Sequence, residues 1–381
     1  MFDVVIIGAG FAGSVLAERL ARLKNKKILI IEQRRHVGGN CFDYVNDHGI
    51  IIHRYGPHLF HTEYRQVFEY LSQFTDWQLY EHRVLAKIDG KKVPLPFNFE
   101  SMEILFGREK AQQLEKKLLN YYPYGTKVPI LELKKNQDED ILFLADFVYK
   151  KVFLHYTAKQ WGKRPEEIDP SVTARVPVLL GRDNRYFQDP YQAIPSKGYT
   201  KIFENMLNHP NIKILLNTSY REIMHFDFQE KKIYLFGLLF SGPVIFTGMV
   251  DELLNYEFGV LPYRSLEFHF KDFDLPFFQE VATVNYPNDH DFTRITEFKH
   301  IHPVENNKTT VVYEYPRAYV KGEIPYYPMF TDEARENYEK YREKAKQIPN
   351  LILVGRLADY RYYDMDDTVK RALEVYEESF S

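Results

Sequence analysis

A glycine-rich turn between a buried strand and a helix limits the possible folds more than any other feature of this chain. The stretch "VVIIGAGFAG" places Gly8, Gly10 and Gly13 in G-x-G-x-x-G spacing directly after the β-branched run 3–8. Residues 13–23 then show helical apolar spacing, and "KILIIE" is typical of a second buried strand. Together they predict a βαβ unit of about 30 residues, the arrangement that holds a dinucleotide.

Two further features of this unit indicate which dinucleotide it binds. Glu32 ends the second strand, where a carboxylate accepts hydrogen bonds from an adenosine ribose. The pair Gly38-Gly39 brings the backbone close to a ligand a second time, which resembles flavoproteins of the glutathione-reductase type. The chain contains no other G-x-G-x-x-G run for a dedicated nicotinamide domain. We therefore expect FAD as the cofactor.

Length and charge narrow the class of protein further. A chain of 381 residues exceeds the usual size of a single core, which favours two or three substructures. Its 50 Lys+Arg and 53 Asp+Glu nearly balance, so we expect neither nucleic acid nor membrane as a partner. The single cysteine, Cys41, cannot form an internal disulfide, and the N-terminal apolar run is too short for a signal segment. A cytoplasmic protein is the expectation.

The remaining pattern predicts how the chain divides. Helical segments are expected at 62–74, 99–107, 108–122 and 141–162, with a hairpin turning at Asp89-Gly90. Many short strands follow residue 210, and a final strand ending at Gly355 precedes an amphipathic helix. The predicted fold is α/β, a discontinuous Rossmann-like FAD-binding domain with an inserted helical domain and an inserted, mainly antiparallel sheet domain.

The predicted boundaries follow from these segments. They are 1–78, 195–245 and 330–381 for the FAD-binding domain, 79–182 for the helical domain with a mobile loop near 167–182, and 183–194 and 246–329 for the β-sheet substrate domain.

A series of motifs, in order along nearly the whole chain, resembles the UDP-galactopyranose mutase family. They are "YGPHLFHT" (55–62), "LPFN" (95–98), "YTAKQWG" (156–162), "RVPV" (175–178), "DNRYF" (183–187), "KGYTK" (197–201), "YRSLEF" (263–268), "TRITEFKH" (293–300), "PYYP" (325–328) and "GRLADYRYYDMD" (355–366). The resemblance implies interconversion of UDP-galactopyranose and UDP-galactofuranose, with FAD active in its reduced form. It implies that N5 of the flavin, rather than a side chain, attacks the sugar, without net redox change. It also implies a homodimer and an external reductant such as NAD(P)H or a reductase.

The resemblance assigns roles to residues of this chain. It makes Arg175, Arg294 and His61 the catalytic side chains, the two arginines binding the diphosphate and His61 lying beside the flavin ring. The expected substrate-binding residues are His82, Tyr156, Thr157, Trp161, Arg175, Tyr186, Arg264, Arg294, Tyr327 and Tyr362. The expected cofactor-binding residues are Gly8, Gly10, Phe11, Ala12, Gly13, Glu32, Gln33, Gly38, Gly39, Asn40, Gly56, His58, Leu59, Gly355, Arg356, Tyr362, Asp364 and Met365.

Several alternatives stay open at this level. His58 and His61 form an H-x-x-H pair, but no further ligand lies at metal-binding spacing, so no metal is expected. His82 stands where several relatives carry an asparagine, which leaves acceptance of an N-acetylated galactose open. Tyr326 competes with Tyr327 for the same role. The competing functions are an amine-oxidase-like FAD oxidoreductase and a protein-binding relative without cofactor, of the Rab GDP-dissociation inhibitor kind.

Overall fold

A five-stranded parallel sheet contains the two strands expected on either side of the glycine-rich turn. The structure is a computed structural model and describes residues 2–161, 164–167 and 177–381. The strands follow the order β12 (Ile212–Leu215), β2 (Ile28–Ile31), β1 (Val4–Ile7), β16 (Val244–Phe246) and β22 (Leu351–Leu353). The predicted return of the last strand to the first sheet is confirmed, because β22 pairs in parallel with β16.

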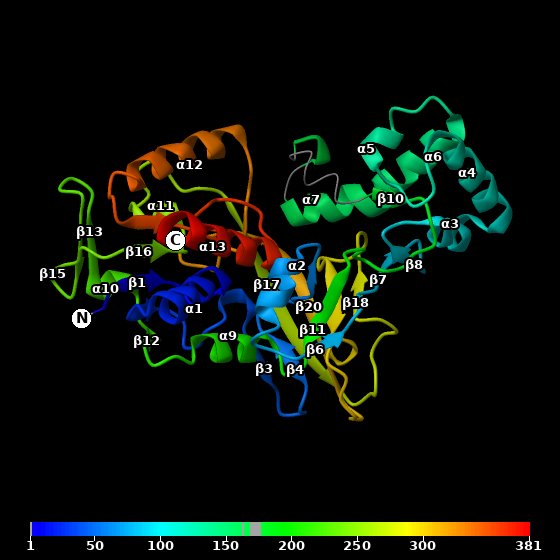
Figure 1. The fold of residues 1–381 in the computed structure, drawn as a ribbon. Helices are drawn as coiled ribbons and strands as arrows, with labels where there is room; N and C mark the ends of the chain where they lie inside the picture. Colours follow the sequence, from blue (N-terminus) through cyan, green and yellow to red (C-terminus); the bar gives the residue numbers. More distant parts are fainter. Residues whose placement is uncertain (1, 162–163, 168–176) are drawn as a thin grey trace.

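Helices and a small three-stranded sheet cover both faces of this sheet (Figure 1). Val4 and Ile6 point to one layer, and Val5 and Ile7 to the other, as the alternation of side chains in a strand requires. The first layer consists of α1 (Phe11–Lys24), α2 (Arg65–Leu71), α9 (Tyr199–Leu207) and α13 (Met365–Phe380). The second consists of α11 (Val250–Leu253), α12 (Asp332–Ala345), β13 (Met224–Asp227), β14 (Lys232–Leu235) and β15 (Leu238–Leu239), with α10 (Tyr220–Ile223) beside them. Burial on both faces explains the uninterrupted apolar strands.

A second, seven-stranded sheet contains the short strands β17 to β21 from the later half of the chain. Its order is β21 (Tyr327–Pro328), β17 (Tyr263–Phe273), β20 (Thr309–Ala318), β19 (Arg294–Glu297), β18 (Thr283–Asn285), β7 (Val84–Ile88) and β8 (Lys91–Leu95). All neighbouring strands are antiparallel except β18 and β7. The predicted hairpin is confirmed, and Asp89 and Gly90 at its turn both have positive φ.

The hairpin β7–β8 belongs to the seven-stranded sheet by its backbone pairing, while its apolar side chains pack in the core of the helices that follow it. The sequence places residues 84–95 inside the helical segment 79–182, but Val84 to Ala86 pair with Thr283 to Asn285 and extend the seven-stranded sheet. Local pattern identifies a hairpin and cannot identify the distant strand that completes its pairing. The domain boundaries themselves stay predictions.

The helical unit lies at one end of the molecule (Figure 1) and shares its apolar core with the hairpin β7–β8. It comprises α3 (Phe99–Phe106), α4 (Arg108–Tyr121), α5 (Ile130–Leu133), α6 (Glu139–Val148), a π-helical segment (Tyr149–Leu154) and α7 (His155–Trp161). The predicted helix 141–162 therefore contains a change of helix type. Within the predicted mobile loop 167–182, β10 (Pro177–Leu179) pairs with β9 (Lys127–Pro129), while residues 168–176 lie outside the described residues.

Smaller elements connect these units. They are β3 (Asp43–Val45) paired with β4 (Ile51–His53), β11 (Tyr191–Pro195) between β5 (Phe60–Thr62) and β6 (Trp77–Leu79), and 3-10 turns at Gly39–Cys41, Pro165–Glu167 and Phe298–His300. No helix in the described part of the chain combines the length and apolar character that crossing a membrane requires.

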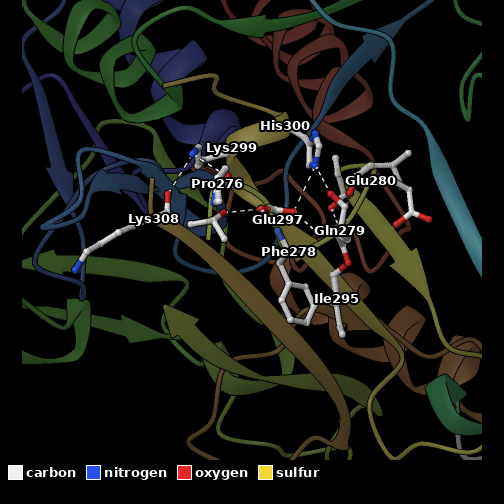
Figure 2. Close-up of polar contacts among 12 residues, drawn as sticks. Pro276, Phe278, Gln279, Glu280, Ile295, Glu297, Lys299, His300 and Lys308 are labelled. Atoms are coloured by element: carbon white, nitrogen blue, oxygen red, sulfur yellow. Dashed lines mark hydrogen bonds and ion pairs between the residues drawn. The ribbon is translucent and has the colours of Figure 1, made fainter. Parts of the chain in front are cut away.

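Buried Glu297 anchors the far end of β19, the strand that begins at Arg294. Its carboxylate accepts hydrogen bonds from the backbone N–H groups of Phe278 (2.8 Å) and Gln279 (2.9 Å) and from the Thr309 hydroxyl (2.6 Å). Figure 2 shows these groups meeting around Glu297. Because the buried carboxylate is saturated with donors, β19 is fixed in register against its neighbouring loops.

Lys299, two positions further on, ties the same loops together. Its buried ammonium donates to the carbonyl oxygens of Pro276 (2.9 Å) and Lys308 (3.2 Å), and also to that of Asn306 (Figure 2 draws the first two residues). One charged group thus satisfies three backbone carbonyls.

Replacing Lys299 should therefore destabilise the fold strongly. Lys299→Met keeps the length of the side chain but leaves buried carbonyls unpaired, so the free energy of unfolding should fall by about 3 kcal/mol or more. The control is Lys308→Met, which removes only an exposed ammonium near Asp274 and should change that free energy by about 0.5 kcal/mol or less. Urea unfolding at pH 7 measures both, and equal effects would contradict the anchoring role.

Candidate functional site

A cavity of about 310 Å³ brings together residues from all three parts of the molecule. Its wall is formed by β17 to β20 and β21, the loop before β5, α7 and the start of α13. The predicted substrate and catalytic residues that line it are His61, His82, Tyr156, Thr157, Tyr186, Arg264, Arg294, Tyr327 and Tyr362. The predicted cofactor residues that line it are Asn40, Gly56, His58, Leu59, Arg356, Tyr362, Asp364 and Met365.

The other predicted cofactor residues lie away from this cavity wall, around the glycine-rich turn. They are Gly8, Gly10, Phe11, Ala12, Gly13, Glu32, Gln33, Gly38, Gly39 and Gly355. The N–H of Gly38 donates to the Ala9 carbonyl (2.8 Å), so the two glycine segments lie side by side. Trp161 is the last residue of α7, and Arg175 lies outside the described residues.

Each of the three glycines of the turn is needed for a different reason. Gly8 has φ of +103°, and a Cβ there would lie 2.1 Å from the Thr247 hydroxyl. A Cβ on Gly13 would lie 2.1 Å from the Gly8 carbonyl oxygen, so close helix–strand packing excludes a side chain. A Cβ on Gly10 would meet only Gly39, at 3.8 Å. The fold thus demands Gly8 and Gly13, whereas the open space at Gly10 fits the pyrophosphate of a bound dinucleotide.

Glu32 and Arg34 also fit a dinucleotide. The buried Glu32 carboxylate accepts from the N–H groups of Ala9 (2.9 Å) and Arg34 (2.8 Å), one on each oxygen, and keeps lone pairs for ribose hydroxyls. The Arg34 guanidinium donates to Asn40 Oδ1 (2.9 Å) and lies over the Tyr55 ring. Its Nη1 is buried and has no hydrogen-bond partner among the described residues. Sequence reasoning missed Arg34, although it follows Glu32 by only two positions.

Arg294 reaches the cavity beside a buried carboxylate that the sequence did not single out. Arg294 on β19 lies directly opposite Glu314 on β20, with 3.2 Å between Arg294 Nε and Glu314 Oε1. Burial opposes the charged form of Arg294, but Glu314 and Tyr156 raise its pKa above the ordinary value. The guanidinium therefore stays charged. The alternation of side chains along "TVVYEYP" was the available signal, because residues directly opposite on paired strands share one face of the sheet and can interact.

Two more arginines lie on the face of one tyrosine. The guanidinium carbons of Arg264 and Arg356 lie 4.8 Å and 5.0 Å from the Tyr327 ring centre, and Tyr362 stacks on Tyr327 at 5.3 Å. Burial lowers the pKa of Arg264 from its very high ordinary value. Tyr326 also lines the cavity but packs against Phe268 by its ring edge. The arrangement offers planar donors to an anion beside flat aromatic surfaces.

The helix α7 supplies the opposite wall. Tyr156 and Thr157 line the cavity, and Gln160 donates from Nε2 to the Tyr156 hydroxyl (3.0 Å). The Oε1 atom of Gln160 accepts from Arg264 (3.3 Å), so this amide links the helix to the sheet. Gln160 was not predicted, although it follows Tyr156 by one helical turn and so shares its face.

Two histidines of the cavity, buried His82 and half-buried His58, are neutral. Burial, together with the charge of Arg294, lowers the pKa of His82 to about 3, and the Nδ1 atom of His82 lies 3.0 Å from the Tyr80 hydroxyl. Burial lowers the pKa of His58 to about 4. Nδ1 of His58 donates to the Gly56 carbonyl (2.8 Å), and the backbone N–H of His58 donates to His53 Nδ1 (3.0 Å). These two bonds hold the loop 56–59 in one conformation.

Three buried residues behind this loop have the spacing of metal ligands, namely Asp43, His53 and His302. Their lone pairs already have partners, since the two imidazoles are 3.0 Å apart at Nε2 and Asp43 accepts from the N–H groups of Tyr199 and Thr200 at the start of α9. This group is therefore a hydrogen-bonded support for the loop. Neither His58 nor His61 belongs to it.

Comparisons with known proteins agree with this geometry. Residues 151–362 match the family model described as UDP-galactopyranose mutase, and residues 6–74 match that of an NAD(P)-binding Rossmann-like domain. The chain is 36% identical to a dTDP-fucopyranose mutase of Escherichia coli, covering 98% of this chain and 97% of the relative. It is 34% identical to a UDP-galactopyranose mutase of Mycoplasma pneumoniae (98% and 94% covered) and 34% identical to a probable UDP-galactopyranose mutase of Klebsiella pneumoniae (100% and 95%).

Solved structures confirm the predicted fold class. A crystal structure of reduced UDP-galactopyranose mutase matches 100% of this chain and 94% of its own, with a TM-score of 0.75 and 16% identity. A putative protoporphyrinogen oxidase from Exiguobacterium (TM-score 0.64, 14% identity, 98% of each chain) and a putrescine oxidase (0.60, 12%, 99% and 98%) share the fold at lower similarity. Family model and full-length relatives together show that the chain belongs to the UDP-galactopyranose mutase family.

Proposed function

We propose that this protein interconverts the pyranose and furanose forms of galactose in UDP-galactose. The observation that carries the proposal is the gathering of Arg264, Arg294 and Arg356 in one cavity lined by tyrosines. A nucleotide sugar brings two negative charges on its diphosphate, and guanidinium groups bind such oxygens two at a time. Family membership relates this arrangement to a mutase rather than to an oxidase.

Each group has a proposed task in this reaction. Arg294, with the sequence-predicted Arg175, binds the diphosphate and stabilises the charge on departing UDP. Tyr156, Thr157, Tyr186, Tyr327 and Tyr362 orient the uracil and the sugar, together with His82 and the predicted Trp161. Arg264 and Gln160 fix the distance between helix α7 and the sheet. The buried positions of His82, Thr157 and Arg264 limit the access of water to the sugar.

We propose FAD as the cofactor, with its ADP part at Gly10, Glu32 and the pair Gly38-Gly39. The ring system would lie along the loop 56–59 and the start of α13, where Asn40, Arg356, Asp364 and Met365 line the cavity. Bound reduced flavin would supply the nucleophile for the anomeric carbon, through N5, with no net change in redox state. An amine-oxidase-like oxidoreductase, the competing function, would oxidise its substrate and need no diphosphate-binding arginines.

A second substrate is supported by the E. coli relative, a dTDP-fucopyranose mutase at 36% identity. Fucose differs from galactose in lacking the 6-hydroxyl, and dTDP differs from UDP at the ribose and the base. A site built to hydrogen-bond a hydroxyl discriminates strongly against an analogue without it. Parallel assays with UDP-galactofuranose and dTDP-fucofuranose decide between the two substrates.

The wider setting follows as part of the same proposal. We propose a homodimer in the cytoplasm. We also propose that NAD(P)H or a reductase reduces it from outside, because the reaction needs reduced flavin and the chain has no second dinucleotide motif. Near-balanced charge gives no support for nucleic acid or a membrane as partner.

Reduction should switch the activity on. Dithionite-treated protein should convert UDP-galactofuranose to UDP-galactopyranose, measured by anion-exchange chromatography, because oxidised flavin lacks the nucleophilic electron pair. The same preparation with its flavin oxidised, verified by absorbance, should be inactive. Equal turnover in both states would contradict the mechanism, and net oxidation of the sugar would favour the oxidoreductase.

Gly10→Val should abolish flavin binding without unfolding the protein. The structure leaves room for a side chain at Gly10, so the new methyl groups occupy only the space assigned to the pyrophosphate. Flavin absorbance of the purified variant measures binding, and circular dichroism and thermal unfolding against the flavin-free wild type measure folding. A folded variant with a full complement of flavin would refute the assignment.

Arg294→Lys should lower turnover while leaving flavin content unchanged. Lysine keeps the charge opposite Glu314 but lacks the planar pair of donors, so the rate should fall about 30- to 1000-fold. Arg317→Lys, on the exposed end of β20, is the matched control and should keep wild-type turnover. Wild-type kcat and KM in Arg294→Lys would remove Arg294 from the diphosphate site.

A further inference from the structure

The amide of Gln160 joins two walls of the cavity through hydrogen bonds of fixed direction. Arg264 Nη1 on β17 donates to Gln160 Oε1 (3.3 Å), and Gln160 Nε2 donates to the Tyr156 hydroxyl one turn earlier on α7 (3.0 Å). A guanidinium has only donors, so the atom that faces Arg264 must be the amide oxygen. The amide nitrogen therefore faces Tyr156, and the two ends of the amide cannot exchange places.

The direction of these bonds determines what the Tyr156 hydroxyl can do. An amide NH2 group only donates, so the hydroxyl oxygen of Tyr156 acts as the acceptor and keeps its own proton. No acceptor for that proton is found among the described residues. Burial raises the pKa of Tyr156 above its ordinary value, so the hydroxyl stays protonated at neutral pH. Tyr156 is thus a donor whose proton is available to a ligand.

The groups around Tyr156 indicate which kind of acceptor suits this proton. Arg264 and Arg294 both interact electrostatically with Tyr156, and all three line the cavity. The nearby carboxylate of Glu314 is occupied, because it pairs with Arg294 and accepts from the Thr293 hydroxyl (3.4 Å). An acceptor oxygen close to two guanidinium groups is favoured when it carries negative charge. A diphosphate oxygen has that charge, whereas the oxygens of a base or a sugar are neutral.

We propose that Gln160 is a positioning residue, which directs the proton of Tyr156 to a diphosphate oxygen of the bound nucleotide sugar. This inference rests on the proposed function, because it takes a nucleotide sugar as the ligand. Without the amide the hydroxyl would rotate, and its proton would face the diphosphate in only part of its orientations. Arg264 belongs to the same chain of bonds, so a cation on the sheet sets the direction of a donor on the opposite wall.

The test measures binding of UDP to the flavin-loaded protein by isothermal titration calorimetry, with dTDP in a parallel titration. Tyr156→Phe removes the donor and should weaken UDP binding about 10- to 100-fold, the usual loss for a hydrogen bond to a charged oxygen. Gln160→Met keeps the approximate length of the side chain but neither of its hydrogen bonds. It should weaken UDP binding about threefold or more.

A double variant separates action through Tyr156 from a general loosening of the site. If Gln160 acts through the hydroxyl, Tyr156→Phe combined with Gln160→Met should bind UDP as Tyr156→Phe alone does, within about twofold. The matched control is Lys159→Met, because Lys159 also anchors α7, by donating to the Tyr286 carbonyl (3.1 Å). Lys159 does not line the cavity, so this variant should bind UDP about as tightly as the wild type.

Uridine, which lacks the diphosphate, reports where the proton goes. Its affinity, measured by competition against UDP, should be the same in the wild type, Tyr156→Phe and Gln160→Met within about twofold. Equal losses for uridine and UDP would place the proton on the base or the ribose and overturn the assignment to the diphosphate. Flavin absorbance and thermal unfolding verify that each variant is folded and loaded.

The outcomes separate this inference from the proposed function. Additive losses in the double variant, or the same loss in Lys159→Met as in Gln160→Met, would overturn the positioning role of Gln160. The proposed function would stand in that case, because the wild type still binds the nucleotide. A wild type that binds neither UDP nor dTDP would reject the proposed function and this inference together.

Discussion

The pair formed by half-buried Arg294 and buried Glu314 is the interaction on which the cavity depends. Removing a guanidinium from water is costly, and a carboxylate directly opposite on the next strand offsets that cost. Glu297 at the other end of the same strand is saturated with donors, so the strand cannot slide. The position of the Arg294 charge at the cavity wall is therefore determined by the hydrogen bonds of Glu297, which lies further along the same strand and outside the cavity.

The remaining groups of the site come from separate units that meet around this fixed strand. The glycine-rich turn belongs to the parallel sheet, Tyr156 and Gln160 to the helical unit, and Arg264 to the antiparallel sheet. Gln160 links helix and sheet by accepting from Arg264, and α13 brings Asp364 and Met365 from the end of the chain. Such a site can assemble only when all three units are folded, which couples binding to the overall architecture.

Much of this arrangement was predictable from sequence, and the reasons for the failures are specific. The glycine turn, the buried strands and the Asp89-Gly90 hairpin are local patterns, and the structure confirms them. The motifs also selected residues that meet in one cavity. Glu314 was missed because its significance depends on a partner on another strand, and the hairpin's sheet was missed for the same reason. The change of helix type before α7 has no clear signature in an apolar segment.

That change of helix type determines which residues of the segment reach the substrate. Successive residues of an α-helix are rotated by about 100°, so the wider π-helical turns at Tyr149–Leu154 alter the orientation of every side chain that follows. Val152 and Phe153 thereby remain in the core of the helical unit, while Tyr156 and Thr157 face the cavity. The number of residues in this segment, more than their chemical identity, is what selects the binding surface. Relatives that differ here by a single insertion or deletion would present a different set of side chains to the sugar, which makes segment length a route to new specificity.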